Sequence, residues 1–158
     1  MTPNEINQIL INKFTDRITS FSVEPPEYYI RINPQDVPEI ISFLKNEPAF
    51  RMDYLSLISG VDWLNENKME VVYHLFSISQ HHNVAVHVYL DRSNPVVPTI
   101  SHLYGAANWH ERETYDLLGI QFEGHPDLRR ILLPDDWDGY PLRKDYKFPD
   151  EYHGVKWA

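Results

Sequence analysis

Two stretches of the chain, MEVVYHLFSI (residues 69–78) and NVAVHVYL (residues 83–90), decide which fold class is available. Both are dense in β-branched and aromatic residues, which fit a pleated and half-buried strand better than a helix. The sequence His-His-Asn at 81–83 separates them and predicts a tight turn. We therefore expect two consecutive strands, at about 69–79 and 83–90.

The segments on the N-terminal side of this pair extend the same sheet. The sequence predicts strands at about 18–24, 27–33 and 51–58, and Glu-Pro-Pro-Glu at 24–27 predicts the turn between the first two. The sequence TPNE at 2–5 reads as a capping box with proline at the first helical position. We therefore expect a helix to precede the first strand.

A second helix is expected to begin at NPQD, residues 33–36, by the same logic as the first. Each helix presents one apolar face, formed by Ile6, Ile9, Leu10 and Phe14 in the first and by Val37, Ile40, Ile41 and Leu44 in the second. The order α-β-β-α-β-β-β predicts an α+β two-layer sandwich, with helices on one face of a mostly antiparallel five-stranded sheet.

The pattern changes after residue 90. We expect a short helix at 99–104, a longer one at 106–118 and little regular structure in 119–158, which holds four of the six glycines. Disordered tails are poor in aromatic residues, yet this one contains Trp137, Tyr140, Tyr146, Phe148, Tyr152 and Trp157. The sequence thus predicts an α+β domain at 1–118 and an extended partner-binding tail at 119–158.

Composition excludes several classes of function. The chain has 158 residues, no cysteine and a net charge of −9, so we expect neither Cys-ligated metal centres nor a nucleic-acid partner. No apolar run approaches the ~20 residues that a membrane-spanning helix needs. The N-terminus has no basic segment followed by an apolar one, so we expect no signal peptide.

The stretch NWHERETYDLLGI, residues 108–120, is the main candidate for chemistry. Its five central residues are all polar and would cover every side of a helical turn. A zinc-protease motif would need histidine where Thr114 stands, and we expect no metal site. Glu113 and Asp116 are three residues apart and could share a site, but Arg112 lies four before Asp116, which favours internal ion pairs.

The block HPDLRRILLPDDWDGYPLRKDY, residues 125–146, favours docking over catalysis. It alternates arginines, apolar residues and aromatics, and Arg, Trp and Tyr are enriched at interface hot spots. We therefore expect partner binding, with Trp137, Tyr140 and Arg143 as anchors. No phosphate-binding or dinucleotide-binding pattern occurs in the sequence.

These residues resemble the 30-kilodalton subunit family of respiratory complex I, which supplies the C subunit of NADH-quinone oxidoreductase. The resemblance is carried by the spacing of Glu111-Arg112-Glu113, Asp116-Leu117-Leu118, His125, Arg129 or Arg130, and Ile131-Leu132. NPVVPTI before this block and PLRKDY after it also look like the family.

The resemblance implies a non-catalytic subunit in the peripheral arm of the complex. It implies docking against the D subunit near the quinone site, no cofactor in this chain, and flavin and iron–sulfur clusters in other subunits. It also implies a peripheral place on the cytoplasmic side of the membrane, reached through the complex. We expect the signature and docking residues to be Glu111, Arg112, Glu113, Asp116, His125, Arg129, Arg130, Trp137, Tyr140 and Arg143.

Two alternatives remain open at the level of sequence. One is the equivalent subunit of a ferredoxin-dependent photosynthetic complex, on the stromal side of the thylakoid, or of a related membrane-bound hydrogenase. The other is an independent enzyme that uses the histidines and carboxylates. We also expect Arg112, Arg129 or Arg130 to lie within ion-pair distance of Glu111, Glu113 or Asp116, because a buried unpaired charge is costly.

Overall fold

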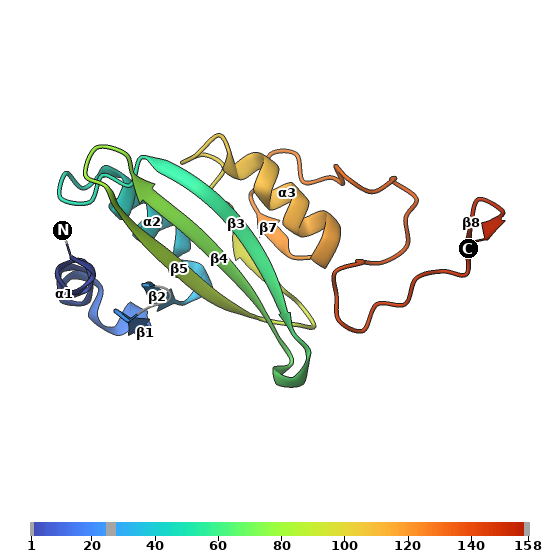
Figure 1. Cartoon of the computed structure of the whole chain (residues 1–158), viewed down its shortest axis with the longest axis horizontal. Helices are drawn as coiled ribbons and strands as arrows, with labels where there is room; N and C mark the ends of the chain where they lie inside the picture. The colour runs from blue at the N-terminus through green and yellow to red at the C-terminus, as the bar shows by residue number, and fades with distance from the viewer. Residues whose placement is uncertain (1, 25–27, 157–158) are drawn as a thin grey trace.

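The computed structural model describes residues 2–24 and 28–156. A five-stranded sheet with the order β1-β2-β5-β4-β3 forms its centre (Figure 1). The strands are β1 (Ile18–Ser22), β2 (Tyr29–Ile32), β3 (Tyr54–Trp63), β4 (Lys68–Ser77) and β5 (His82–Asp91), and the helices are α1 (Pro3–Phe14), α2 (Val37–Asn46) and α3 (Ala107–Leu118). The α+β class is thus confirmed. The predicted turn at 24–27 lies largely outside the described residues.

The sheet is mixed, which corrects the expectation of a mostly antiparallel one. Strand β2 runs parallel to β5, whereas β1–β2, β3–β4 and β4–β5 are antiparallel pairs. The parallel pair arises because α2 carries the chain from β2 to β3 across the sheet, and β4 and β5 then return as a meander that fills the space between β2 and β3. This long-range pairing leaves no local signal in the sequence.

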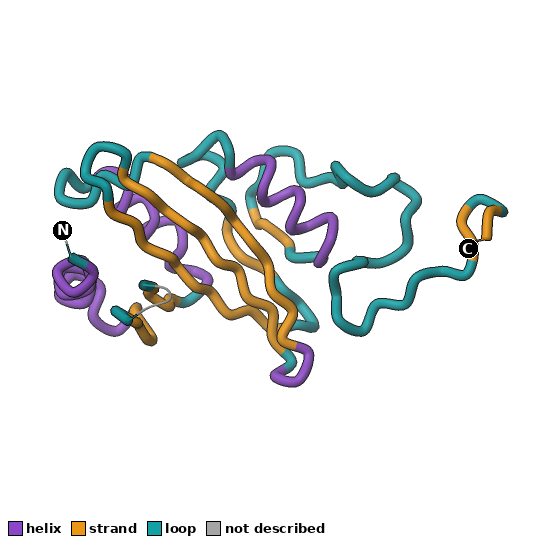
Figure 2. The backbone as a smooth tube through the Cα atoms, viewed as in Figure 1, coloured by secondary structure: helices purple, strands orange, loops and turns teal. Residues whose placement is uncertain are grey.

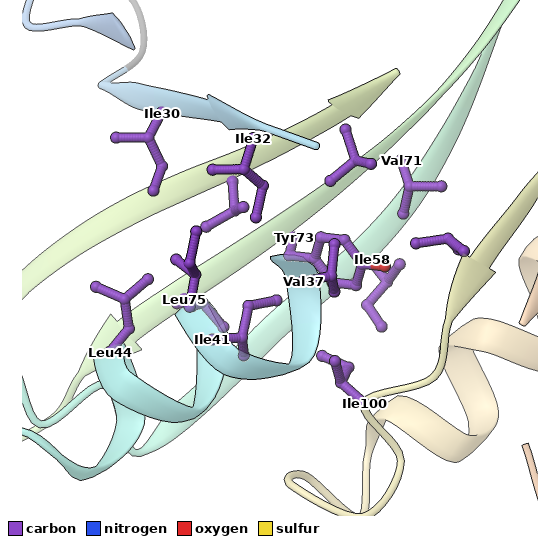
Figure 3. Packing of buried hydrophobic residues seen from close by; sticks show 14 of the residues in the cluster. Ile30, Ile32, Val37, Ile41, Leu44, Ile58, Val71, Tyr73, Leu75 and Ile100 are labelled. Carbon is purple, nitrogen blue, oxygen red and sulfur yellow. The ribbon is translucent and has the colours of Figure 1, made fainter. Parts of the chain in front are cut away.

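The hydrophobic core lies between the sheet and its helices. In α2, Val37, Ile41 and Leu44 point at the strands (Figure 3), and all three are fully buried. They face Tyr73 and Leu75 of β4, whose side chains are also buried. Helix α1 joins this layer through Phe14, whose ring packs edge-on against Phe43 of α2. At this size such burial supplies most of the folding free energy.

The ends of several elements differ from the sequence-based expectations. Thr2 and Glu5 form the predicted capping box, but 34–36 form a short 3₁₀ turn (η2, Pro34–Asp36) before α2 begins. Two further 3₁₀ turns, η1 (Thr15–Arg17) and η3 (Leu64–Glu66), follow α1 and β3. The helix expected at 99–104 is absent, because the amides of Leu103 and Tyr104 both bond to one carbonyl and close a single turn.

The packed domain continues beyond α3. A two-stranded parallel sheet pairs β6 (Val96–Pro98) with β7 (Gln121–Glu123), and Ile120 and Phe122 belong to the buried core. The three-residue strands were not anticipated, since each is stabilised by a partner some 25 residues away in the chain. A division after residue 118 therefore stays a prediction, although the core itself reaches Phe122.

The residues that follow β7 run along the end of α3 and then away from the sheet (Figures 1 and 2). They are loop except for a distal hairpin of β8 (Glu151–Tyr152) and β9 (Val155–Lys156). Within the described residues, no helix has the length and apolar character needed to cross a bilayer.

Candidate functional site

Helix α3 is the element that positions the charged residues singled out in the sequence. It lies against β3, where a Cβ on Gly60 would come within 2.9 Å of the Thr114 methyl group. The Thr114 hydroxyl is satisfied within the helix by the carbonyl of His110. The polar turn can therefore pack against the sheet, because its buried groups find partners inside the chain.

Asp116 is the strongest of these partners. Its side chain is fully buried, and its Oδ2 accepts hydrogen bonds from the amides of Ile131, Leu132 and Leu133 at 3.0, 2.7 and 3.0 Å. Its Oδ1 accepts from the guanidinium of Arg130 at 2.8 Å. Three successive amides converging on one carboxylate fix the backbone of 131–133 at the helix.

Arg130 continues the attachment further along the chain. Its Nη1 also donates to the Asp116 carbonyl at 2.9 Å, and its Nη2 donates to the carbonyls of Trp137 and Gly139 at 3.1 and 2.9 Å. The predicted ion pair between an arginine of 129–130 and an α3 carboxylate is thus confirmed. One side chain joins three separate parts of the chain, which suits the planar fork of arginine better than lysine.

The ionisation of Asp116 follows from these contacts. Burial alone would raise its pKa, but the hydrogen bonds from the Leu133 amide, Arg130 and the two neighbouring amides together lower the pKa below its usual range. The carboxylate therefore stays charged at neutral pH and keeps all its donors engaged.

The four-residue spacing suggested that Arg112 pairs with Asp116, but the two side chains do not pair. The Nε of Arg112 donates to the carbonyl of Arg129 at 3.2 Å, and its guanidinium lies 5.2 Å from the Trp109 ring centre. Its nearest carboxylate partner is Asp127 at 4.0 Å. Arg112 thus holds the segment before 131–133, whereas the side chain of Arg129 itself is 71% exposed.

Glu111 occupies a second buried site on the opposite side of α3. Its carboxylate accepts from the Thr99 hydroxyl at 2.5 Å and from the Ile100 amide at 2.8 Å. Burial raises its pKa to about 7, although these two hydrogen bonds act in the lowering direction. The hydroxyl of Tyr73 in β4 is buried nearby, and burial, with the charge of Glu111, raises the pKa of that phenol.

His125 lies beside Glu111 but hydrogen-bonds elsewhere. Its Nδ1 accepts from the Asp127 amide at 3.0 Å, so a neutral ring carries its proton on Nε2, which then donates to the Asn108 carbonyl at 3.2 Å. The distance from Nε2 to the Glu111 carboxylate is 3.8 Å. His125 therefore links the turn after β7 to the first turn of α3.

Tyr140 and Arg143 contact their own chain at the end of α3. Gly119 ends the helix with φ of 74°, and a Cβ there would lie 2.5 Å from the Tyr140 ring. Arg143 donates to the Leu118 carbonyl at 2.7 Å, and the guanidinium groups of Arg143 and Arg130 lie 5.0 and 5.3 Å from the same ring. Glycine is needed here for both its conformation and its size.

A second anchor for the tail was missed in the sequence. Asp62 of β3 is fully buried and accepts two hydrogen bonds from Arg92, at 2.6 and 2.9 Å, and one from the Lys144 amide at 2.8 Å. Arg92 also pairs with Asp145 at 2.5 Å. The three parts come from positions 30 and 52 residues apart, so no local pattern could reveal them.

Beyond these anchors the tail folds on itself through aromatic rings. The Trp137 ring lies 5.2 Å from Tyr152 and 6.4 Å from Phe148. Asp136 accepts from the hydroxyl of Tyr152 and pairs with His153, both in the distal hairpin region. These ring contacts join the distal hairpin to residues 136–148, although Phe148 remains 63% exposed.

The contacts of these buried side chains hold a segment of the chain in position against α3. The described residues contain no cluster of three or more histidine or acidic side chains that could hold a metal ion, and the absence of a cofactor stays a prediction. Glu113 is exposed and forms none of the ion pairs found in the described part. The buried members of the predicted site join α3 to 99–100, 125–133 and 137–143.

Comparison with known proteins identifies the family. The family described as the 30 Kd subunit of respiratory-chain NADH dehydrogenase matches residues 30–152. The C subunit of NADH-quinone oxidoreductase from Chlorobium phaeobacteroides is 41% identical over 150 residues, covering 94% of this chain and 90% of that protein. Its counterpart from Chloroherpeton thalassium is 40% identical over 151 residues, but the chain spans only 62% of its length.

Two solved structures share the fold. A trypsin-resistant fragment (1–134) of Nqo5 has a TM-score of 0.66 and 29% identity, covering 78% of this chain and 98% of the fragment. A chain of the membrane-bound sulfane sulfur reductase, an archaeal respiratory membrane complex, has a TM-score of 0.75 and 25% identity, covering 91% of this chain and 85% of that one.

Proposed function

Because the chain belongs to the 30 Kd subunit family of respiratory-chain NADH dehydrogenase, we propose that it is a peripheral-arm subunit of a proton-translocating NADH:quinone oxidoreductase. In this proposal the chain carries no active site. Flavin and iron–sulfur clusters reside in other subunits, and the chain lies at the cytoplasmic side of the membrane through the complex. Its contribution to quinone reduction is to hold the assembly together.

One observation carries this proposal: the tail is held in a fixed course while its apolar side chains remain exposed. Asp116, Arg130 and Asp62 bind the backbone of 131–144. Leu132, Leu142 and Phe148 nevertheless expose 60%, 56% and 63% of their surface. A preorganised segment with exposed apolar groups loses less entropy on binding than a disordered one.

We assign the docking role to this exposed set within the tail. Tyr140 and Arg143, two of the three anchors expected from the sequence, are half-buried against α3, so in this proposal they shape the tail. The partner is the D subunit, and the contact lies near the quinone site. The trypsin-resistant Nqo5 fragment ends at residue 134 of its own numbering, which supports a boundary between a compact domain and a tail.

The test replaces exposed apolar groups without touching the anchors. Leu142→Asp and Phe148→Asp should each reduce incorporation into the complex, and with it quinone reduction, by about tenfold or more, because a charge replaces an apolar contact. Ile78→Asp is the matched control, since Ile78 is 57% exposed in the turn between β4 and β5. Native gels of membranes measure incorporation. Normal incorporation of both tail variants would contradict the proposal.

A second assignment keeps the role but changes the complex. The fold shared with a chain of the sulfane sulfur reductase complex favours the equivalent subunit of a related membrane-bound complex, such as a hydrogenase or the ferredoxin-dependent photosynthetic complex. Mass spectrometry of the complex purified through a tag on this chain separates the alternatives. Co-purifying NADH-binding flavoprotein supports the first assignment, and a hydrogenase or ferredoxin-binding subunit in its place supports the second.

A further inference from the structure

A hollow lies where the turn between β3 and β4 meets the tail. It is lined by the end of β3 and by η3 on one side and by Lys144 of the tail on the other, and its volume is about 540 Å³. Lys144 reaches this place because its amide donates to the buried carboxylate of Asp62 at 2.8 Å. Figure 1 shows the tail passing beside this end of the sheet before it runs outward. The hollow is thus built from two segments that the second anchor holds together.

The wall that the sheet contributes to the hollow is apolar and exposed. Trp63 and Leu64 expose 40% and 42% of their surface, and Val61 completes this wall. The indole of Trp63 donates to the buried carboxylate of Glu70 at 2.8 Å, so the ring is fixed before anything binds. Apolar groups that gather at one exposed place mark an interaction site, and groups that are already fixed lose less entropy on binding.

The carboxylates that line the hollow are already paired within the chain. Both oxygens of Asp62 accept hydrogen bonds from Arg92, and one of them also accepts from the Lys144 amide. Glu66 pairs with Lys68 at 3.7 Å. A cation bound in the hollow would have to displace these partners, and the two carboxylates oppose a polyanion such as a nucleic acid. Recognition at this site therefore depends on the apolar wall.

The exposed apolar surface of the tail begins directly beside the hollow. Leu142 is two residues before Lys144, it exposes 56% of its surface, and its amide donates to the Leu117 carbonyl at 3.0 Å. Because the Lys144 amide is bound by Asp62 of β3, residues 142–144 are held between α3 and the sheet. A partner seated on Leu142 therefore comes within two residues of the hollow.

We infer, resting on the tail docking proposed above, that the partner that covers Leu142 also places an apolar side chain in this hollow, beside Leu64. A small ligand would need convergent polar groups to fix its orientation, and the oxygens of Asp62 are engaged within the chain. A protein side chain is oriented by its own backbone and needs only the apolar wall. The occupant is an aliphatic or aromatic side chain of the partner, and the docking surface extends from the tail onto the sheet.

The experiment places a photoreactive side chain at single positions of the full-length, tagged chain. Leu64, Leu142 and Ile78 are each replaced by p-benzoylphenylalanine, and the chain is expressed at its native level. Membranes are illuminated, the adducts are purified through the tag, and the coupled peptides are identified by mass spectrometry. Ile78 is the matched control, because it is 57% exposed and follows the end of β4 that lies opposite η3.

We expect positions 64 and 142 to form adducts with one and the same other polypeptide, and position 78 to form none with it. Leu64→Asp should lower recovery of that polypeptide with the tagged chain at least about tenfold, because a charge replaces an apolar contact. Leu64→Met, which keeps the contact apolar, and Ile78→Asp should each lower it less than about twofold. Circular dichroism establishes that each variant is folded, and the adduct at position 64 does not depend on the Leu64→Asp chain.

The two positions separate this inference from the tail docking on which it rests. An adduct at 142 with another polypeptide, but none at 64, would overturn the inference and leave the tail docking standing. So would an adduct at 64 with the same chain, a second copy or a different polypeptide, or recovery that Leu64→Asp leaves unchanged. An adduct at 64 but none at 142, or none at either position, would contradict the tail docking and the inference together.

Discussion

Strands β3–β5 and residues 124–146 belong to one molecule, but different forces hold them in place. The strands bury Met69, Val71 and Val86 completely against the helices. The tail segment instead depends on Asp116, Arg130 and Asp62, which bind backbone amides and carbonyls. Apolar burial is spread over many side chains, whereas the tail is attached through a small number of polar contacts, of which those of Asp116 and Asp62 are the most buried.

This difference predicts how each region fails. Loss of one methyl group from a shared core costs roughly 1 kcal/mol and leaves the rest in place. Loss of one buried carboxylate leaves several donors without acceptors at once, and the cost is concentrated in the segment they belong to. The tail should therefore detach while the sheet stays folded.

The largest effect is expected at the first anchor. Asp116→Ala removes the acceptor of three amides and of Arg130, and we expect the free energy for local opening of residues 131–133 to fall by about 3–5 kcal/mol. The rate of limited trypsin cleavage after Arg129 and Arg130 measures this loss. Glu113→Ala, an exposed position of the same helix, should change it by less than ~0.5 kcal/mol. Equal effects of the two variants would contradict the role of Asp116.

The buried Glu111 should make stability depend on pH. Its pKa is raised from 4.5 to about 7 by burial, so the folded chain holds this proton more tightly than the unfolded one. The contribution of the protonated Glu111 to the free energy of unfolding is fully present below pH 4.5. It falls by about 3 kcal/mol in total as the pH rises to about 7. Glu111→Gln, which cannot ionise, should therefore gain stability relative to wild type at pH 8 but not at pH 5.

Urea titrations of wild type and Glu111→Gln at the two pH values test this sign. Glu113→Gln serves as the neighbouring control, and its difference from wild type should not change between pH 5 and pH 8. A Glu111→Gln chain that loses stability equally at both values would show that the carboxylate is held ionised by its hydrogen bonds with Thr99 and Ile100.

The second anchor should have a smaller and more local effect. Asp62→Asn keeps the shape but loses the charge that Arg92 and the Lys144 amide bind. We expect the free energy that holds the tail at this anchor to fall by about 2 kcal/mol, because charge-assisted hydrogen bonds are replaced by weaker ones. Limited proteolysis should cut near Lys144 and Lys147 at least about tenfold faster. Unchanged cleavage there would show that Asp62 does not hold the tail.

The smallest effect is expected in the distal hairpin. Tyr152→Phe removes the hydroxyl that donates to Asp136, and both groups are open to solvent, which weakens such a bond. The denaturation midpoint should stay within experimental error of wild type. A clear decrease would show that the aromatic contacts of Trp137 and Tyr152 depend on this hydrogen bond, and that the tail has a third anchor.

The sequence predicted those parts of the fold whose signal is local. The β-rich runs at 69–78 and 83–90 and the capping box at 2–5 correspond to β4, β5 and the start of α1. The parallel pairing of β2 with β5 and the β6–β7 pair could not be predicted, because each joins segments that are distant in the chain.

The contacts of the candidate site likewise divide into those that a local pattern in the sequence predicts and those that join distant segments. An ion pair between α3 and an arginine of 129–130 could be expected from charge density in one short stretch. The Asp62–Arg92 anchor could not, since Asp62 reads as an ordinary residue of β3 and its partners are 30 and 82 residues away. Burial of Tyr140 against Gly119 was also hidden, because an aromatic residue at an interface and one packed on its own chain look alike in sequence.

Amide hydrogen exchange of the native chain tests most directly whether the two regions are held separately. The amides of Ile131, Leu132 and Leu133 bond to Asp116, and those of β4 bond within the sheet. In Asp116→Ala we expect the protection of the amides of Ile131, Leu132 and Leu133 to fall at least about a hundredfold. The amides of β4, which exchange by global unfolding, should keep their protection. Parallel loss of protection in both regions would show that the tail and the sheet form one cooperative unit, and would contradict this account.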